Sequence, residues 1–379
     1  MGDTKYSTLF DTLKKEILSG KYHLDKPFPS VRGLIGRFGL SDRTVRHALD
    51  ELFAQGLISR KQGRGTFVTS QGSSRKIGLI IPGVAYSEFF PPIVSQISKM
   101  AQDAGYTLLF GDVMSSNPET RARKARRFAV ELVRERVAGV IYQPLEFLTN
   151  ADQINHEIVS IFERARTPVV LLDYDIVSPP ERSHYDVIGI NNPDAGYRLA
   201  NHLISCGARK IHFLMRPNWA PSVRNRLRGV ITAISAANSR GVRKLKCGIL
   251  TAEPEDLAAL KRHLRRGRPD AFICGNDTAA AKFKQTLEKL GLLVPRDLLL
   301  AAFDDVQIAG LLTPPLTTIH QPCAEIGAAA FNRLLTRIAT PDLPVQEIYL
   351  SAPLIVREST RVVSPNRKTG SEKTDQKGC

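Results

Sequence analysis

The chain has 379 residues and a formal net charge of +16, with 53 Lys and Arg against 37 Asp and Glu. This length predicts two or three domains, and the charge favours an anionic partner. Only part of the excess lies in residues 1–70, which hold 12 Lys and Arg against 7 Asp and Glu. No apolar run reaches the ~18 residues that cross a membrane, and the N-terminus lacks a hydrophobic signal region. We therefore predict a cytoplasmic protein without membrane association.

The five cysteines show no CxxC spacing and no metal-ligand pattern. Their odd number suits a reducing compartment. The chain also has no Gly-x-Ser-x-Gly elbow, Walker loop or His-Glu-x-x-His site. We therefore predict no enzymatic activity, no cofactor and no metal.

Residues 6–55 predict three helices. Apolar residues at helical spacing indicate a first helix over Tyr6–Ser19, which Gly20 ends. Ser30 is the predicted N-cap of a second helix, and Ser41 of a third that runs to about Gln55. Two short helices joined by a turn that contains glycine are typical of a helix-turn-helix. The polar positions at the start of its second helix are those that touch base edges in such motifs.

A basic hairpin follows these helices. Leu57–Ser59 and Thr66–Val68 predict two strands around the turn Arg60–Gly65. The glycines let the backbone approach a phosphate, while the cations neutralise it.

Residues 6–69 resemble the winged-helix domain of the GntR family of bacterial transcription factors. The resemblance rests on the segments PSVR (29–32), TVR (44–46), EL (51–52), GLI (56–58) and QGRGTFV (62–68). It implies contacts to operator DNA from Arg32, Thr44, Arg46 and the wing residues Gly63, Arg64 and Gly65. Ser41 and Arg43, at the start of the same helix as Thr44, complete the predicted set of DNA contacts. Asp42 stands where family members commonly carry Arg; it could cap the helix or accept a hydrogen bond from cytosine.

The pattern changes after residues 70–75, which are rich in Ser and Gly. Short apolar strands alternate with amphipathic helices from Lys76 to Phe303, as in βαβ units with parallel sheets. Two successive blocks of this kind predict an α/β fold with two doubly wound lobes and a cleft between them. The helices predicted here include Ile93–Gly105, Arg224–Asn238 and Pro254–Arg266.

Polar residues stand directly after several of the predicted strands. In open parallel sheets, ligands bind beyond the carboxyl ends of the strands. The residues at these positions are Asp173, Asn276, Asp277, Asp304 and Asp305, and helix capping is the alternative role for each. The sole tryptophan, Trp219, lies in a polar loop, where it either fills a lobe or stacks on a ligand ring.

Residues 76 to about 360 resemble the effector domain of the LacI/GalR repressors, which is itself like the periplasmic binding proteins. The strongest matching segments are NNPDAG (191–196), RLRG (226–229), GND (275–277), FDD (303–305) and VREST (356–360). The resemblance implies ligand contacts from Asp173, Ser222, Arg226, Asn276, Asp304 and Gln321, with Phe89 or Phe90 as an apolar wall. Carboxylates, amides and aromatic rings suit a polyol. Tyr174 and Cys323 depart from the pattern of the family.

The combination of the two parts resembles the arabinose-responsive repressors of some bacteria. We therefore predict a DNA-binding transcriptional regulator, with a domain over residues 1–69, a linker over 70–75, a two-lobed domain over 76–361 and a disordered tail over 362–379. The expected partners are operator DNA, a small-molecule effector bound between the lobes, and a second copy of the chain. A sugar is the favoured effector and a purine or nucleoside the alternative; repression is favoured over activation. An enzyme and a free-standing solute-binding protein are the rival classes.

Overall fold

The computed structural model describes residues 5–18, 21–22, 26–61, 63–69, 76–81, 87–111, 113, 115, 117–177, 180–241 and 244–361. The predicted linker over 70–75 and the predicted tail over 362–379 lie outside these residues. The chain divides into two compact units. Unit 1 consists of residues 1–192, 217–225 and 321–353, and unit 2 of residues 193–216, 226–320 and 354–379.

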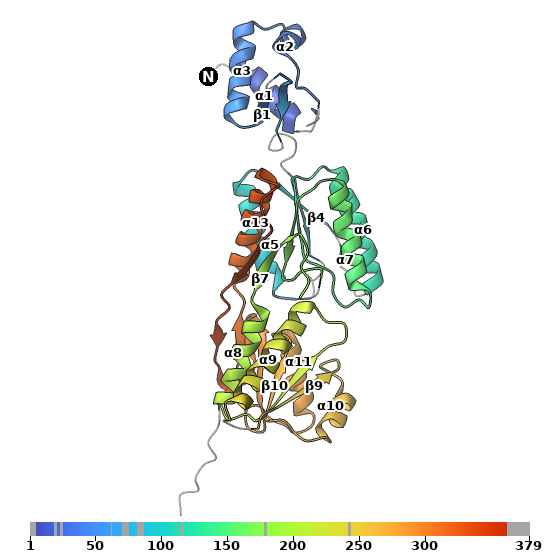
Figure 1. Ribbon diagram of the computed structural model, residues 1–379, viewed down its shortest axis with the longest axis vertical. Helices are drawn as coiled ribbons and strands as arrows, with labels where there is room; N and C mark the ends of the chain where they lie inside the picture. Colours follow the sequence, from blue (N-terminus) through green and yellow to red (C-terminus); the bar gives the residue numbers. More distant parts are fainter. Residues whose placement is uncertain are drawn as a thin grey trace, which may run out of the picture. The chain divides into compact units, whose positions relative to one another are not determined.

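The first part of unit 1 is a three-helix domain with a short hairpin (Figure 1). Its elements are α1 (Lys5–Leu18), α2 (Val31–Phe38), α3 (Asp42–Ala54) and the antiparallel strands β1 (Ile58–Lys61) and β2 (Gly65–Val68). Ser30 and Ser41 cap α2 and α3 as predicted, because their side chains accept hydrogen bonds from the backbone amides of Gly33 and Thr44. A core of its own holds the domain together, with Leu13, Leu34 and Leu52 fully buried.

The rest of unit 1 is a six-stranded parallel sheet with helices on both faces (Figure 1). Its strand order is β13-β7-β6-β5-β3-β4. Helices α5 and α13 pack together on one face, and α6 and α7 on the other (Figure 1). The strands are β3 (Lys76–Ile80), β4 (Thr107–Phe110), β5 (Val140–Tyr142), β6 (Val169–Leu172), β7 (Asp186–Ile190) and β13 (Glu347–Leu350). The helices are α5 (Phe90–Asp103), α6 (Pro118–Arg134), α7 (Ala151–Arg164) and α13 (Cys323–Ala339).

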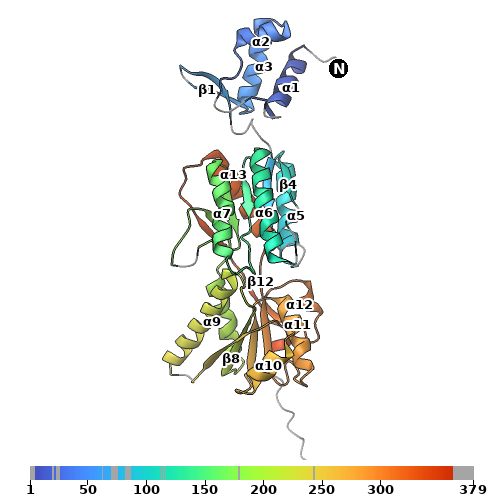
Figure 2. The same ribbon diagram turned by 90° about the vertical axis from the view of Figure 1, so that its right-hand side faces the viewer.

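Unit 2 contains a second six-stranded sheet, ordered β14-β12-β11-β10-β8-β9, in which only β14 runs antiparallel. Helices α8 and α9 lie on one face and α11 and α12 on the other (Figure 2). The strands are β8 (Lys210–Met215), β9 (Lys246–Thr251), β10 (Ala271–Cys274), β11 (Leu299–Asp304), β12 (Thr317–His320) and β14 (Leu354–Ile355). The helices are α8 (Asn192–Ser205), α9 (Pro221–Ser239), α10 (Leu257–Leu264), α11 (Asp277–Glu288), α12 (Gln307–Leu311) and the 3-10 turn η1 (Glu358–Thr360).

These two sheets confirm the predicted α/β fold class. Two details differ from the expectation. Helix α10 is shorter than predicted at both ends, because Asp256 caps it at Leu257 and it ends at Leu264. The elements after Phe303 were not assigned from the sequence, and one of them, β13, joins the sheet of unit 1 beside β7.

A buried ion pair anchors α13 to the sheet of unit 1. Asp186 at the start of β7 is almost fully buried, and its carboxylate accepts hydrogen bonds from Arg333, Arg337 and the amide of Gln346 at 2.8–2.9 Å. These hydrogen bonds hold the pKa of Asp186 below its usual value despite burial, which raises it. The charge is therefore compensated inside the fold.

Two helices of unit 2 cross at very close range. A Cβ added at Gly229 on α9 would lie 1.9 Å from the carbonyl oxygen of Pro193, and one at Gly196 on α8 would lie 2.0 Å from that of Arg226. Only glycine permits this approach of two backbones. The crossing fixes the position of α9, which carries Arg226.

Candidate functional site: a nucleic-acid interface and a ligand-binding constellation

The polar side of α3 is exposed. Arg43 and Arg46 project from its first turns into solvent, and Thr44 is half-buried. Ser41 caps the helix, so Asp42 does not act as the cap; its carboxylate instead pairs with Arg46 Nε at 2.6 Å. That pair holds the Arg46 guanidinium near the helix N-terminus, where a recognition helix meets base edges.

The hairpin carries its cations in and beside a tight turn that contains two glycines. Gly63 and Gly65 adopt positive φ angles of 73° and 105°, which the tight turn requires. Arg60 stacks 4.8 Å above the ring of Phe53, and Lys61 lies 4.8 Å above the ring of Phe67. Arg64 at the tip is exposed. Arg60 and Lys61 belong to the turn whose cations are expected to neutralise a phosphate, although neither was named among the predicted DNA contacts.

Arg32 is exposed on the first turn of α2. The predicted DNA contacts therefore come from three places in this domain: the start of α2, the start of α3 and the hairpin. All are exposed except Thr44. Their side chains are polar or basic, and the acidic Asp42 beside them is paired with Arg46.

The predicted ligand residues of unit 1 cluster at the carboxyl ends of its strands. Asp173 follows β6 with a φ of 75°, and Ser222 Oγ donates to its Oδ2 at 3.2 Å. Trp219 is 5% exposed and lies 6.3 Å from the ring of Phe147. Phe89 and Phe90, at the start of α5, are buried and pack edge to face at 4.9 Å.

Gln143 belongs to the same edge of the unit 1 sheet and was not predicted. It follows β5, is 2% exposed, and its Oε1 has no hydrogen-bond partner among the described residues. Burying a polar atom without a partner costs about 1–3 kcal/mol, so a ligand hydroxyl or amine would stabilise it. The signal that pointed to Asp173, a polar residue directly after an apolar strand, holds for Gln143 as well.

In unit 2, the predicted residues gather around one guanidinium. Arg226 is 4% exposed; its Nη1 donates to the carbonyl of Gly275 at 2.6 Å and lies 3.3 Å from Asp304 Oδ1. Its plane also stacks 4.7 Å from the ring of Phe303. Asp304 has a φ of 113°, a conformation that costs a residue with a side chain about 1–3 kcal/mol. Such strain is typical of functional positions.

The other polar residues at this edge divide by role. Asn276 caps α11, because its side chain accepts a hydrogen bond from the backbone amide of Ala279 at 2.8 Å. Asp277 is fully buried, and its carboxylate accepts from Thr318 Oγ1 and the amide of Val306. Burial and the nearby charge of Asp304 hold the pKa of Asp277 well above its usual value. Asp277 therefore stabilises the loop after β11 through these hydrogen bonds and is not available to contact a ligand.

Asp305 pairs with Arg357 at 2.7 Å and with His320 at 3.0 Å. Gln321 follows β12 and is 2% exposed. Cys323, which departs from the family pattern, is partly buried.

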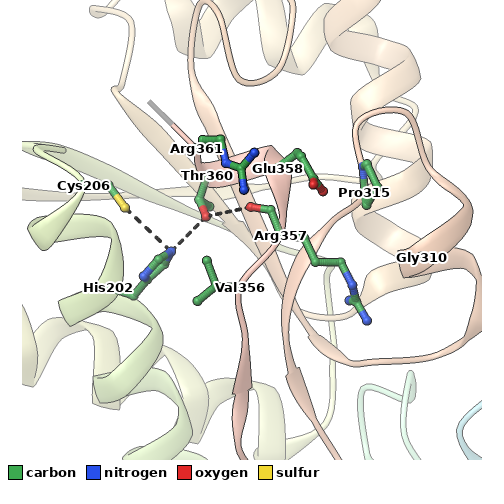
Figure 3. Close-up of a pocket in the computed structure, with 9 residues that line it drawn as sticks. All are labelled: His202, Cys206, Gly310, Pro315, Val356, Arg357, Glu358, Thr360 and Arg361. Atoms are coloured by element: carbon green, nitrogen blue, oxygen red, sulfur yellow. Dashed lines mark hydrogen bonds between the residues drawn. The ribbon is translucent and has the colours of Figure 1, made fainter. Parts of the chain in front are cut away.

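A separate hollow of about 560 Å³ lies in unit 2 (Figure 3). Its lining includes His202, whose Nε2 is 2.8 Å from Thr360 Oγ1 and 3.7 Å from Cys206 Sγ (Figure 3). Because Thr360 and Pro315 lie next to the start of β12, the hollow is at the amino-terminal end of this sheet, opposite Asp304. It is therefore distinct from the predicted ligand residues.

Comparisons with known proteins agree with this geometry. Residues 5–68 match the family described as bacterial regulatory proteins, gntR family, and residues 200–360 match the periplasmic binding protein-like domain. The chain therefore joins a GntR-type helix-turn-helix domain to a periplasmic-binding-protein-like domain of the LacI type. It is a transcriptional regulator of the LacI/GntR type, as the sequence predicts.

Two relatives and one solved structure are similar to this chain over most of their own length. An arabinose metabolism transcriptional repressor from Geobacillus stearothermophilus is 28% identical over 95% of this chain and 98% of its own length. The HTH-type transcriptional repressor PurR of Vibrio vulnificus is 27% identical over 84% of this chain and 90% of its own length. The transcription regulator GntR from Chromobacterium violaceum, a solved structure, is 27% identical with a TM-score of 0.60, covering 75% of this chain and 99% of that one.

No described helix has the length and hydropathy needed to cross a membrane. Among the described residues, no three His, Cys, Asp or Glu side chains gather where they could hold a metal ion.

Proposed function

We propose that the protein is a repressor whose affinity for operator DNA is controlled by a sugar. Arg32, Arg43, Arg46 and the hairpin would contact the operator. The sugar would be held by the residues that each unit places at the carboxyl ends of its strands. A homodimer would set the spacing of two DNA-binding domains on a near-palindromic operator.

The observation that carries the proposal is the pair of strained aspartates. Asp173 in unit 1 and Asp304 in unit 2 each end a buried strand with a positive φ angle. Each also meets a polar residue of α9, Ser222 or Arg226, which stand four residues apart on that helix. Carboxylates bind vicinal hydroxyls, and Trp219 and Phe89 offer aromatic surface for the apolar side of a sugar ring.

The relatives support two classes of effector. One of them is named for arabinose metabolism and another is the repressor PurR. A purine or nucleoside is therefore the second candidate, and the aromatic rings of Trp219 and Phe89 would also suit a flat ring.

The first experiment is thermal shift of the full chain against sugars, sugar phosphates, nucleosides and purines. A ligand at 100 times its Kd stabilises the folded state by about 2.7 kcal/mol. We expect a shift with a sugar. A shift with purines alone would contradict the sugar assignment, but it would leave the proposal of a ligand-controlled repressor in place.

Variants then test the site with the ligand that binds. Asp173→Asn and Asp304→Asn keep a residue that tolerates positive φ and remove the charge. Each should raise the Kd at least tenfold, since a hydrogen bond to a charged group contributes about 1.5–3 kcal/mol. Asp342→Asn, at an exposed position of unit 1, is the matched control and should bind normally. Normal binding by both site variants would refute the assignment.

Operator binding gives the sign of the response. Because the coupling between two ligands is reciprocal, an inducer that weakens DNA binding must itself be bound more weakly by the DNA complex. An effector that strengthens operator binding would contradict induction of a repressor by that molecule.

A further inference from the structure

One concentration of positive charge outside the DNA-binding domain lies in unit 2. Residues 261–268 (KRHLRRGR) contain five Lys and Arg and no acidic residue. Two other basic stretches, around residues 209–210 and 244–246, lie near the start of β8 and β9. Besides Arg268, which interacts with the charge of Asp297, they supply eight exposed cations, here called the amino-end cluster: Arg209, Lys210, Lys244, Lys246, Lys261, Arg262, Arg265 and Arg266.

The contacts of the fold bring these three stretches together. Lys210 and Lys246 are register partners at the start of the parallel strands β8 and β9. The Lys210 ammonium lies 4.0 Å from where a Cβ would stand on Gly267, just after α10. His212 Nδ1 and His263 Nε2, 2.7 Å apart, join β8 to α10. Helix α10 and strand β9 lie on the same side of unit 2 in Figure 1.

The cluster is not neutralised within the fold. None of its eight cations forms an ion pair with any of the described residues, whereas other cations of unit 2 do, such as Arg216 with Glu253 and Lys282 with Glu255. The adjacent carboxylate of Asp270 accepts the backbone amides of Arg209 and Lys210 at 2.7 and 2.8 Å. Cations this close together repel one another, so an anion that bound here would relieve that repulsion.

The histidines beside the cluster add no charge at neutral pH. Burial, helped by His263 and Lys210, lowers the pKa of His212 to about 4. Burial and the charge of Arg266 lower the pKa of His263. The carboxylate of Asp270 faces His212 and opposes part of this effect. The attraction for an anion therefore rests on Lys and Arg alone.

The composition of this surface indicates which kind of anion it binds. The hollow of unit 2 is lined by none of the cluster residues. The only large apolar side chain exposed on the described part of these three segments and strands is Ile249, whereas the centre of a protein interface is normally apolar and rich in aromatic residues. An extended row of phosphates, one charge per ~1.7 Å of duplex axis, needs only spaced cations.

We propose that the amino-end cluster is a second DNA-contacting surface, which binds the phosphate backbone of duplex DNA without regard to sequence. It acts in addition to the helix-turn-helix domain and rests on the DNA-binding function proposed above. Its binding releases counterions, so its affinity falls steeply with salt.

The test uses the full chain with the operator-reading arginines removed (Arg43→Ala with Arg46→Ala). Fluorescence anisotropy with a random-sequence 30-base-pair duplex gives the Kd between 50 and 200 mM KCl. In that background, the cluster variant carries Lys261→Gln, Arg262→Gln, Arg265→Gln and Arg266→Gln. The matched control carries Arg123→Gln, Arg127→Gln, Arg134→Gln and Arg164→Gln, which remove four exposed cations from α6 and α7 of unit 1.

Each released phosphate contact changes the slope of log K against log salt by about 0.9. We expect the slope of the cluster variant to be shallower by about 2 to 3.6, which is a ~15- to 150-fold smaller loss of affinity over this fourfold salt range. The control should keep the slope of its parent. Equal changes in both variants, or none in the cluster variant, would overturn the proposal.

Two further readouts separate the explanations. Loss of polyglutamate binding in the cluster variant, with DNA binding unchanged, would assign the surface to an acidic protein and overturn the DNA assignment. Operator binding that survives Arg43→Ala with Arg46→Ala in the otherwise wild-type chain would refute the helix-turn-helix contacts, whatever the slope of the cluster variant. Unchanged thermal stabilisation by the effector confirms that each variant is folded.

Discussion

The close crossing of α8 and α9 gives the sharpest test of the structure. Gly229→Ala places a Cβ 1.9 Å from the carbonyl oxygen of Pro193 and 2.8 Å from the amide nitrogen of Tyr197. Real Cβ contacts are essentially never shorter than 3.0 Å, so the helices must separate by about 1.1 Å. Both neighbouring atoms belong to backbone, which cannot rotate away as a side chain could.

The cost of that separation follows from the packing around it. Leu199, Leu203, Val230 and Ala233 on these helices are fully buried, so a shift of the helices opens their contacts. Overpacking of a core costs 1–3 kcal/mol when side chains can adjust, and a backbone clash lies at or above that range. We expect Gly229→Ala to lower the free energy of unfolding by about 3–5 kcal/mol.

Urea unfolding followed by circular dichroism measures this difference. Gly310→Ala in α12 of the same unit is the control, because no atom lies within 4 Å of its added Cβ; its effect should stay within about 0.5 kcal/mol. The displaced helix also carries Arg226, so effector binding should weaken in conditions where the variant is still folded. An unfolding free energy for Gly229→Ala equal to that of Gly310→Ala would refute the close crossing.

Three further predictions concern other parts of the molecule. Arg46→Ala should weaken operator binding by about 1–3 kcal/mol and leave thermal stabilisation by the effector unchanged; loss of both in a folded protein would contradict the separation of the two sites. Asp186→Asn should destabilise unit 1 by about 3 kcal/mol, because it leaves two buried guanidinium groups without their counter-charge, and a melting temperature like that of wild type would exclude this role. Glu16, paired with Arg37 and Tyr22, has its pKa lowered from 4.5 to about 2; its contribution, about 2 kcal/mol after solvent screening, is complete above pH 4.5 and falls as the pH drops towards 2. The stability difference between wild type and Glu16→Gln, measured by urea unfolding, should therefore shrink between pH 6 and pH 3, and a constant difference would disprove the pairing.

Local signals in the sequence were sufficient for the individual elements. Ser30 and Ser41 cap helices because a short hydroxyl side chain before an apolar periodic segment satisfies free amides whatever the rest of the fold does. The strands around Asp173 and Asp304 follow from apolar runs of the right length. Both signals depend on neighbours within a few residues.

The long-range features could not be read in the same way. Strand β13 pairs with β7, about 160 residues earlier in the chain. A local sequence pattern cannot predict a pairing over that distance. Asp277 carries the same signal as Asp304, a polar residue after a strand, yet it is buried beneath Thr318. Gln143 carries it too and was passed over. Only the packing of neighbouring loops decides which of these side chains is left to meet a ligand.

The position of Trp219 has a practical consequence. It is the only tryptophan of the chain, and it stands in the short segment 217–225, which belongs to unit 1 although unit 2 precedes and follows it in the sequence. Its indole is 5% exposed beside Phe147, two residues before α9 begins. The protein thus carries a single indole fluorophore, three residues from Ser222, and tryptophan-selective excitation would let its emission follow effector binding in solution without any attached dye.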